Sequence, residues 1–327
     1  MTHAIRIHGT GGPEVLQWEE VAVGDPAAGE VRVRHHAVGV NFIDIYHRSG
    51  LYPLPLPSGI GMEGAGVVEA VGPGVADLAV GDRIAYAGGA LSPVGAYAEA
   101  RNIAADKVVK LPAAIDFDTG AAMMLQGLTA QYLLRRTYRV QPGDTILIHA
   151  AAGGVGLIVC QWAKALGATV IGTVSSDEKA ALAKAHGCDH PIIYTRENFT
   201  QRVRELTGGA GVPVVYDSIG KDTFTGSLDC LRPLGMMVTF GNASGPVGAF
   251  DTAELAKRGS LFLTRPTLFT SIAKRDDLLA MAADLFEVVG GGKVKIEVNH
   301  RYALRDAAQA QADLAARKTT GSIILKP

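Results

Sequence analysis

The chain has 327 residues, of which 31 are basic and 32 acidic, so its formal net charge is −1. This length accommodates two domains. A charge near zero gives no general field that attracts nucleic acid or an anionic membrane, which argues against both as partners. Glycine is frequent, with 40 residues against a usual share of roughly 7%. Many tight turns or close backbone approaches are expected, as in nucleotide-binding α/β folds.

No stretch of the sequence predicts a targeting or membrane segment. The first residues lack the apolar run of a signal peptide, and no segment approaches the roughly 18 uninterrupted apolar residues of a membrane span. We therefore expect a cytoplasmic protein without membrane partners. The three cysteines, Cys160, Cys188 and Cys230, are widely spaced and predict no disulfide framework.

The first third of the chain is predicted to form short strands separated by glycine and proline. Residues Glu30–Arg34 alternate between apolar and polar side chains, and Gly64–Val71 form an apolar run. The turn signal Gly72-Pro73-Gly74 and the segment Val80–Ile84 follow. This spacing favours a β-rich, barrel-like domain.

The pattern changes after Pro112. Asp118–Arg136 is rich in helix-forming residues, and strands then alternate with helices. The predicted strands are Thr145–His149, Thr169–Val174, Val212–Tyr216 and Met236–Phe240, and the predicted helices are Val155–Leu166, Asp177–His186 and Phe224–Leu231. Such alternation predicts an α/β domain, a parallel sheet with helices on both faces. Near the end, Ala303–Ala316 predicts an amphipathic helix and Ser322–Leu325 a strand.

A turn of small residues joins the first of these strands to its helix, in the order Ala151-Ala152-Gly153-Gly154-Val155-Gly156. Compared with the fingerprint G-x-G-x-x-G, Ala151 takes the first position and Gly153 and Gly156 the other two. The middle glycine lets the backbone approach a pyrophosphate, and the last lets the helix pack close to the strand. The helix start supplies N–H groups for the anion. The segment predicts a dinucleotide site; the alternative is a turn that only packs tightly.

The end of the second strand indicates which dinucleotide binds. NAD-binding folds place an acidic residue there to hold the ribose hydroxyls. Here Ser175, Ser176 and Lys179 are found instead, and the first acid, Asp177, is placed to begin the next helix. Hydroxyl donors and a cation suit a 2′-phosphate, which predicts NADPH. A helix N-cap followed by a solvated lysine is a compatible alternative.

Several segments resemble the quinone oxidoreductase/zeta-crystallin family, a zinc-free branch of the medium-chain dehydrogenases/reductases, and especially its bacterial quinone oxidoreductases. They are residues 11–16, 41–44, 48–53, 215–220 and 320–322, and above all the stretch from Gly143 to Lys164. The resemblance runs nearly end to end. It implies a GroES-like catalytic domain at residues 1–114 and 293–327, a Rossmann NADPH-binding domain at residues 115–292, and a homodimer.

The same resemblance implies a set of cofactor contacts. They are Asn41, Tyr46, Thr129, Gly153, Gly154, Val155, Gly172, Lys179, Tyr194, Ser218, Phe240, Arg265 and Arg317. Ser175 and Ser176 join them from the argument on the 2′-phosphate. Without the resemblance, Arg265 and Arg317 could equally be surface charges.

Zinc ligands are missing at the positions where zinc-dependent relatives carry them. Those relatives use a cysteine in the segment that here begins at Asn41, and the histidine of a Gly-His-Glu motif that here is Gly61-Met62-Glu63. Neither Asn41 nor Met62 is a good zinc ligand. His35 and His36 are neighbours in a predicted strand and point to opposite faces. We therefore expect no metal.

Without a metal, hydrogen bonds must meet the charge that develops on a reduced carbonyl. Asn41, Tyr46 and Tyr52 are the candidate catalytic residues, because an amide and two phenols can donate. The expected reaction is NADPH-dependent reduction of a quinone or a similar small electrophilic acceptor, in which the cofactor carries the chemistry. Two alternatives stay open. One is reduction of activated C=C bonds in enals or enones. The other is an NADPH-regulated RNA-binding or structural role, which the neutral charge disfavours.

Overall fold

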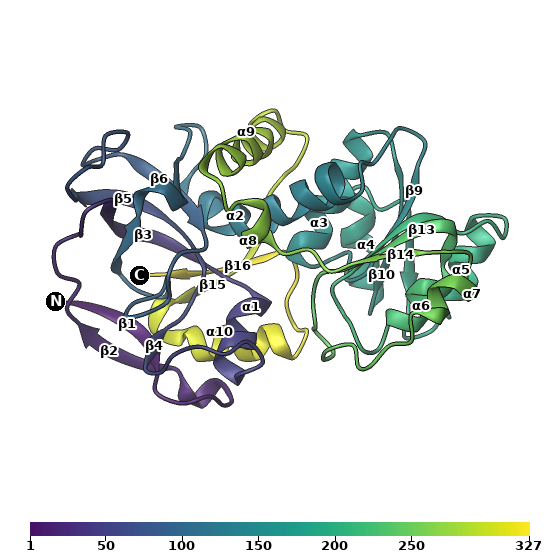
Figure 1. Cartoon of the computed structure of the whole chain (residues 1–327), viewed down its shortest axis with the longest axis horizontal. Coiled ribbons are helices and arrows are strands. Elements are labelled where there is room, and N and C mark those ends of the chain that lie inside the picture. Colours follow the sequence, from purple (N-terminus) through teal and green to yellow (C-terminus); the bar gives the residue numbers. More distant parts are fainter. The chain divides into compact units, whose positions relative to one another are not determined.

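The computed structural model describes residues 1–327, which form two compact units. The first unit comprises residues 1–128, 272–290 and 296–327, and the second comprises residues 129–271 and 291–295. These boundaries differ from the predicted ones. Residues 115–128 and helix α9 (Arg275–Gly290) belong to the first unit, whereas the predicted boundaries assign both to the Rossmann domain. Figure 1 shows the elements of each unit.

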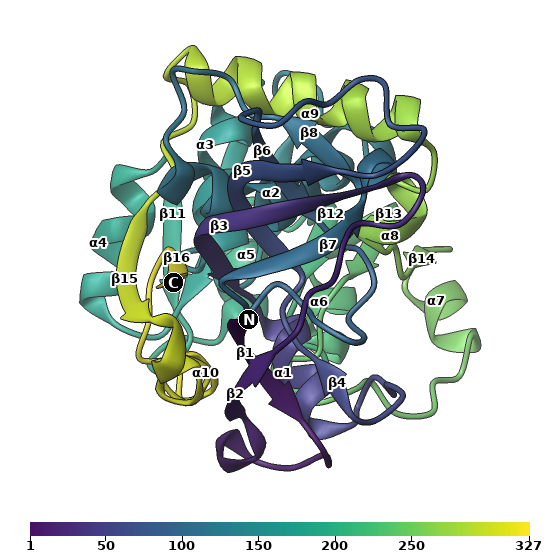
Figure 2. The same ribbon diagram turned by 90° about the vertical axis from the view of Figure 1, so that its left-hand side faces the viewer.

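The first unit is built on a seven-stranded sheet in the order β15-β16-β3-β5-β6-β8, with β7 paired to β3. Figure 2 shows β3 between β5 and β7. The strands are β3 (Glu30–Val40), β5 (Glu63–Val71), β6 (Arg83–Ala87), β7 (Ala100–Ala104), β8 (Val108–Lys110), β15 (Val298–Ala303) and β16 (Ser322–Lys326). The C-terminal β16 pairs antiparallel with β3, so the last strand of the chain completes a sheet built mainly from residues 30–110.

A smaller antiparallel sheet, in the order β2-β1-β4, completes the strands of the first unit. It consists of β1 (Thr2–Ile7), β2 (Gln17–Val21) and β4 (Ser58–Gly59), and the helices of this unit are α1 (Phe42–Ser49), α9 and α10 (Ala307–Ala315). The prediction of a β-rich domain is confirmed. The β1–β2 hairpin and helices α1 and α9 were not predicted.

The alternation along β3 explains how it packs. Val31, Val33 and His35 are buried, whereas Arg34 and His36 point outward. The His35 ring contacts the carbonyl of Ala98 at 2.6 Å and the hydroxyl of Tyr86 at 2.7 Å. Burial lowers the pKa of His35 to about 4, which keeps it neutral near pH 7. The two histidines therefore face opposite sides, as predicted.

The second unit is a six-stranded parallel sheet in the order β11-β10-β9-β12-β13-β14. Its strands are β9 (Thr145–Ile148), β10 (Thr169–Val174), β11 (His190–Ile193), β12 (Val212–Asp217), β13 (Leu231–Thr239) and β14 (Phe262–Thr264). Its helices are α3 (Gly154–Ala165), α4 (Asp177–Ala185), α5 (Phe199–Leu206), α6 (Phe224–Asp229), α7 (Ala253–Lys257) and α8 (Leu268–Ser271). The strand order reverses between β9 and β12, which is the switch point of a Rossmann fold. The predicted α/β domain is confirmed.

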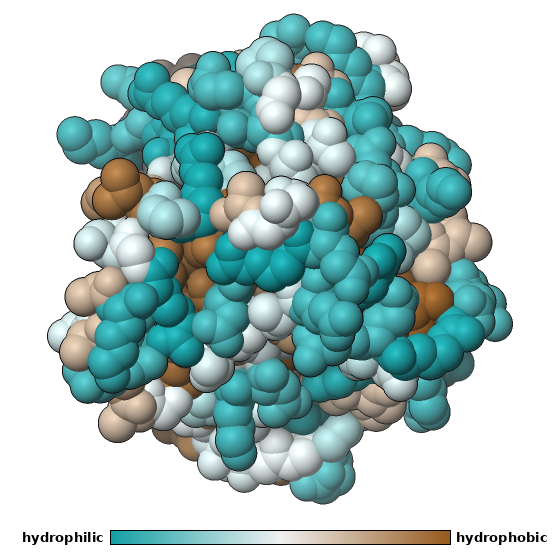
Figure 3. All heavy atoms as spheres, turned by 90° about the vertical axis from the view of Figure 1, so that its right-hand side faces the viewer, coloured by the Kyte–Doolittle hydropathy of each residue, from teal (hydrophilic) through white to brown (hydrophobic).

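Helix α2 (Phe117–Tyr132) begins in the first unit and ends in the second. A π-helical segment, Leu133–Thr137, continues it, so the single predicted helix 118–136 has two parts. The three cysteines are free and buried. No helix has the length and apolar character needed to cross a bilayer. Hydrophilic residues predominate on the face shown in Figure 3, where hydrophobic residues form separate patches.

Candidate functional site

The turn after β9 has the features that a dinucleotide requires. Ala150 takes a left-handed φ of 55°, and the N–H of Ala151 donates to the carbonyl of Thr173 at 3.0 Å. A Cβ at Gly156 would lie 2.3 Å from the carbonyl oxygen of Ala150, so only glycine lets α3 pack this closely. A Cβ at Gly153 would meet a single atom, at 3.2 Å, which leaves the backbone open there. The free N–H groups of Gly154 and Val155 at the start of α3 complete a cradle that fits a pyrophosphate.

Gly172 has a packing role beside the turn. A Cβ there would lie 2.6 Å from the Cβ of Ala151 and 2.7 Å from the Sγ of Cys188. The close approach of β10 to the turn therefore requires glycine whether or not the cofactor contacts it.

The other cofactor residues predicted in this unit collect at the carboxyl ends of the strands. Ser175 and Ser176 follow β10, and Tyr194, Ser218, Phe240 and Arg265 follow β11, β12, β13 and β14 in turn. Backbone bonds hold neighbouring ends together, since Tyr194 N donates to Val174 O at 3.1 Å and Phe240 N to Asp217 O at 2.8 Å. Ligands of open parallel sheets bind at this edge.

The start of α4 supports both interpretations of the serine pair. Ser176 accepts the N–H of Lys179 at 3.3 Å and so caps the helix. Asp177 is exposed and forms an ion pair with Arg196 at 2.5 Å. Glu178 is the second acid of this segment, and it contacts the side chain of Ser176. The hydroxyl of Thr195 donates to the carbonyl of Ser175 at 3.1 Å, so the segment that carries Arg196 lies against the serines. Arg196 is a second cation there, and it was not predicted.

A buried hydrogen-bond chain ties the ends of β9, β10 and β12 together. Thr173 lies 2.9 Å from Nδ1 of His149, and Ser227 lies 2.9 Å from its Nε2. The Ser227 hydroxyl donates to Asp217 Oδ2 at 2.9 Å, so Nε2 carries the proton and Nδ1 accepts from Thr173. Burial lowers the pKa of His149, which keeps the ring neutral. We call these four residues, Thr173, His149, Ser227 and Asp217, the His149 chain.

Asp217 also fixes the loop that carries Ser218. Its Oδ1 accepts the N–H groups of Ile219 at 2.8 Å and Gly220 at 3.0 Å, and its Oδ2 accepts the hydroxyl of Thr223 at 2.7 Å. Four donors therefore surround one fully buried carboxylate.

In the first unit, Asn41 is buried just before α1, and its amide is held on both sides. Its Nδ2 donates to Glu63 Oε2 at 2.7 Å, and its Oδ1 accepts from Gln126 Nε2 at 3.1 Å. Its backbone N–H donates to Asp44 at 2.9 Å, and that carboxylate also accepts the hydroxyl of Tyr97 at 2.8 Å. These contacts place the Asn41 amide with Nδ2 toward Glu63 and Oδ1 toward Gln126.

Glu63 and Asp44 are the two acids of this cluster, and neither was predicted as a site residue. Burial raises the pKa of Glu63 to about 8 and that of Asp44 to about 7. Glu63 also accepts the N–H of Leu125 at 2.8 Å. A Cβ at Gly39 would lie 2.3 Å from Glu63 Oε2, so glycine at that position makes room for the acid. The sequence signal for Glu63 is the motif Gly61-Met62-Glu63, whose middle residue argues against zinc.

The predicted tyrosines lie together. The rings of Tyr46 and Tyr52 are 5.2 Å apart between centroids, and Tyr52 N donates to Tyr46 O at 3.0 Å. Phe42 and His47 extend the cluster, with centroids 6.2 Å from Tyr46 and 6.1 Å from Tyr52 respectively. Burial lowers the pKa of His47 to about 4, so its ring is neutral near pH 7. The cluster offers an aromatic surface with hydroxyl groups.

The remaining predicted residues lie in varied surroundings. Thr129 is buried on α2. Arg265 donates to Thr239 Oγ1 at 3.1 Å and to the carbonyl of Gly241 at 3.0 Å, which holds it beside the end of β13. Arg317 belongs to the first unit and takes a left-handed φ of 58° in the turn after α10.

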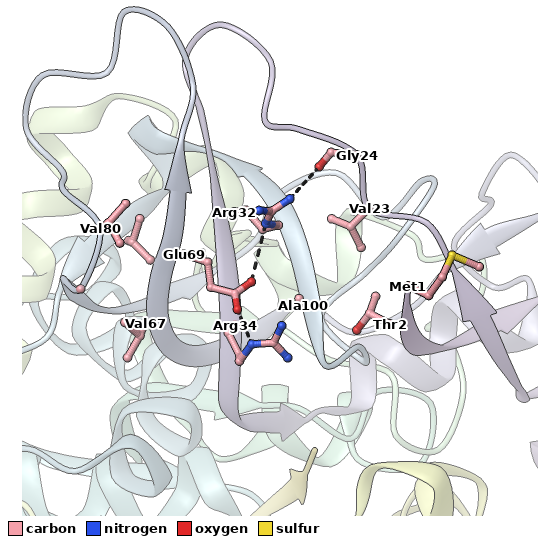
Figure 4. A pocket seen from close by; sticks show the side chains of 12 residues that line it. Met1, Thr2, Val23, Gly24, Arg32, Arg34, Val67, Glu69, Val80 and Ala100 are labelled. Atoms are coloured by element: carbon pink, nitrogen blue, oxygen red, sulfur yellow. Dashed lines mark hydrogen bonds and ion pairs between the residues drawn. The ribbon is translucent and has the colours of Figure 1, made fainter.

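The structure offers no other candidate site of comparable quality, either as a metal centre or as a surface groove. No three His, Cys, Asp or Glu side chains are grouped as a metal site requires. A groove of about 570 Å³ on the first unit is lined by Arg32, Arg34 and Glu69, among others (Figure 4). Both guanidinium groups pair with Glu69 there, and the groove contains none of the predicted site residues.

Family models match a segment in each unit, and the second of these segments extends into helix α9 of the first unit. Residues 27–113 match the family model of the alcohol dehydrogenase GroES-like domain, and residues 154–287 match that of the zinc-binding dehydrogenases. A quinone oxidoreductase of Pseudomonas aeruginosa is 56% identical, with 100% of both chains covered. A 2-haloacrylate reductase of Burkholderia sp. is 50% identical, with 100% of this chain and 99% of the relative covered.

The solved structures include a close match with a bound cofactor. The crystal structure of Escherichia coli quinone oxidoreductase complexed with NADPH superposes with a TM-score of 0.97, at 50% identity, and covers 99% of this chain and 100% of that one. Together with the full-length relatives, this match confirms the resemblance noted in the sequence. The chain belongs to the quinone oxidoreductase family of the medium-chain dehydrogenases/reductases.

Proposed function

We propose that the protein reduces quinones with NADPH and without a metal. The observation that carries this proposal is the composition of the β10 end, where two hydroxyls and two cations stand close to an open dinucleotide turn. Ser175, Ser176, Lys179 and Arg196 suit a 2′-phosphate, and the nearby Asp177 is already paired with Arg196. The bound NADPH of the E. coli relative supports the same cofactor.

The cofactor, when bound, supplies the hydride, and the residues of the chain bind and orient. In the second unit, Gly153, Gly154 and Val155 hold the pyrophosphate, while Tyr194, Ser218, Phe240 and Arg265 lie at the edge where the rest of a dinucleotide binds. In the first unit, Asn41 donates an amide N–H, and Tyr46 and Tyr52 offer rings and hydroxyls. A quinone has two conjugated carbonyls, so it needs alignment and a hydrogen bond more than a Lewis acid.

The 2-haloacrylate reductase supports a second candidate, the reduction of an activated C=C bond, because it is as similar as several quinone oxidoreductases. A turnover screen with NADPH separates the two functions. We expect quinones to be reduced faster than 2-haloacrylates, enals or enones. Much faster turnover of any of these alkenes than of every quinone tested would replace the quinone assignment and keep the NADPH site.

The cofactor preference is testable at Lys179. We expect Lys179→Ala to weaken NADPH by about 10- to 150-fold, because a charge-assisted hydrogen bond contributes about 1.5–3 kcal/mol. NADH, which lacks the phosphate, should bind almost unchanged. Fluorescence titration with each cofactor measures both affinities. Equal losses for the two cofactors would mean that Lys179 has a structural role.

Zinc independence and the homodimer complete the proposal. Elemental analysis should find no stoichiometric zinc, and a chelator should leave turnover intact. The edge strand β14 presents Phe262 and Leu263, whose exposed fractions are 57% and 39%. An exposed apolar edge of this kind is suited to pairing with a second copy. Light scattering coupled to gel filtration should give twice the mass of the chain.

A further inference from the structure

Four buried side chains of the first unit form a hydrogen-bond chain in which every donor points the same way. Ser322 donates to Gln126 Oε1 at 2.7 Å, Gln126 Nε2 donates to Asn41 Oδ1 at 3.1 Å, and Asn41 Nδ2 donates to Glu63 Oε2 at 2.7 Å. All four residues are at least nine-tenths buried. We call them the Asn41 chain.

The direction of the Asn41 chain is decided at Glu63. The ionised carboxylate can only accept, and its oxygens face Asn41 Nδ2 and the N–H of Leu125. A protonated Glu63 could instead donate to Asn41 Oδ1, and both amides would then turn over. Ser322 could follow, because the carbonyl of Ala122 at 3.2 Å offers its hydroxyl another acceptor. The hydrogen bonds of the Asn41 chain can therefore all run in one direction or all in the opposite one, and the charge of Glu63 selects the direction.

We propose that Glu63 is the positioning residue of Asn41, because its carboxylate holds the amide with Nδ2 toward Glu63 and thereby fixes the direction of the second N–H. That second hydrogen is the donor assigned above to the bound cofactor or acceptor, so the inference rests on the proposed function. Glu63 itself touches neither. It acts through the side-chain amide of Asn41, whose orientation it sets.

The surroundings of Glu63 fit an acid that changes charge near neutral pH. Asp44 on α1 disfavours a second negative charge, and Tyr86 on β6 is the other titratable group nearby. Arg101 on β7 and His35 on β3 contact the far side of Tyr86. Burial raises the pKa of Glu63, whereas the donors from Asn41 and Leu125 lower it, which leaves it at about 8.

Two substitutions separate positioning from packing. Glu63→Gln keeps the shape and loses the charge, whereas Glu63→Asp keeps the charge and shortens the side chain. In Glu63→Gln the single oxygen stays with the immobile N–H of Leu125, so the amide nitrogen faces Asn41 and turns it over. At about pH 9, above the pKa of Glu63 of about 8, we expect kcat with NADPH and a quinone to fall about 10- to 100-fold, as when one preorganised donor is lost. Glu63→Asp should retain a higher kcat than Glu63→Gln despite a lower Tm.

Asp44→Asn is the matched control, since it makes the same change in an equally buried acid that contacts only the backbone of Asn41. Its Tm should fall, and at about pH 9, where Glu63 is ionised with or without Asp44, kcat should fall less than in Glu63→Gln. A higher kcat in Glu63→Gln than in Glu63→Asp would overturn the proposal, and so would losses of kcat in all three variants that simply follow their Tm values.

A measurement on the unsubstituted protein keeps the proposal testable if these variants fold poorly. In protein labelled with [15N]asparagine and free of cofactor, the side-chain NH2 signals of Asn41 should shift with pH as Glu63 ionises, at about pH 8. Asn41 signals that stay constant across the pH range in which the carboxyl 13C signal of Glu63 itself titrates would overturn the proposal. A wild-type protein that reduces no quinone would refute the proposed function instead, and the kcat comparison would then use the best acceptor of the screen.

Discussion

The Asn41 chain and the His149 chain have the same hydrogen-bond pattern, but the carboxylates at their ends hold different groups. Each consists of four buried groups that donate in one direction and end on a carboxylate. Asp217 accepts two backbone N–H groups and two hydroxyls, so it fixes a loop and leaves no donor unused. Glu63 receives the amide of Asn41, which retains one unused N–H. A saturated chain stabilises backbone, whereas a chain with one spare donor orients a functional group.

Removing the acid of the His149 chain should give the largest effect on stability. Asp217→Ala leaves the N–H groups of Ile219 and Gly220 and two hydroxyls without their acceptor. Breaking a buried charged network in this way costs about 3–5 kcal/mol. Urea unfolding measures the loss, and NADPH titration should show weaker binding because the Ser218 loop is released. A loss below about 1 kcal/mol would contradict a saturated, stabilising chain.

The acid of the Asn41 chain should make stability fall as the pH rises from about 4.5 to 8. The pKa of Glu63 is about 8 in the folded protein and 4.5 as its ordinary value. A raised pKa gives stability that is complete below about pH 4.5 and is lost as the pH rises through 8. Urea unfolding should therefore show a slope of up to about 1.4 kcal/mol per pH unit from this group. Glu63→Gln should reduce the slope, and Asp44, with a pKa of about 7, maintains the remainder.

The His149 chain predicts the opposite sign. Burial lowers the pKa of His149 below its ordinary value of 6.5, so its contribution is present above pH 6.5 and is lost as the pH falls. An unchanged slope above pH 6.5 in Glu63→Gln would show that Glu63 does not titrate in this range. If Glu63 positions Asn41 in its ionised form, turnover and stability should move in opposite directions as the pH rises toward 8.

The smallest expected effects come from removing the first donor of each chain. Thr173→Val and Ser322→Ala each leave one buried acceptor unpaired, which costs about 1–2 kcal/mol. Chemical unfolding should give similar losses for both. Turnover should fall more in Ser322→Ala, because Gln126 is then free to turn and Asn41 with it. Equal turnover in the two variants would show that the Asn41 chain has no greater effect on catalysis than the His149 chain.

Local sequence patterns predicted the second unit well. The strand Thr169–Val174 has the predicted bounds, and the strands Thr145–His149 and Val212–Tyr216 differ by one residue. The predicted helix Phe224–Leu231 ends at Asp229, because β13 begins at Leu231 and pairs with β12 through a register shift. Short apolar runs between turns and helices carry this information, since the strands of a parallel sheet are buried on both faces.

The placement of α9 could not be obtained in this way. The helix was not predicted, and a local pattern does not show what a helix packs against. Arg275 donates to the carbonyls of Asp106 and Val108, and a Cβ at Gly127 would lie 2.6 Å from Leu285. These contacts join parts of the chain far apart in sequence. The Asn41 chain was missed for the same reason, because Ser322 and Gln126 are 196 residues apart.

Gly39 shows that a functional site can depend on a residue that has no reactive or hydrogen-bonding side chain. It has no side chain, forms no part of any motif and lies within a regular strand. Yet even a methyl group there would displace either Glu63 or the carbonyl of Ala121, at 2.3 Å and 2.4 Å from it. Mutagenesis restricted to residues that contact the substrate would not include Gly39. Mutagenesis of the scaffold would lower activity there without altering a single reactive group.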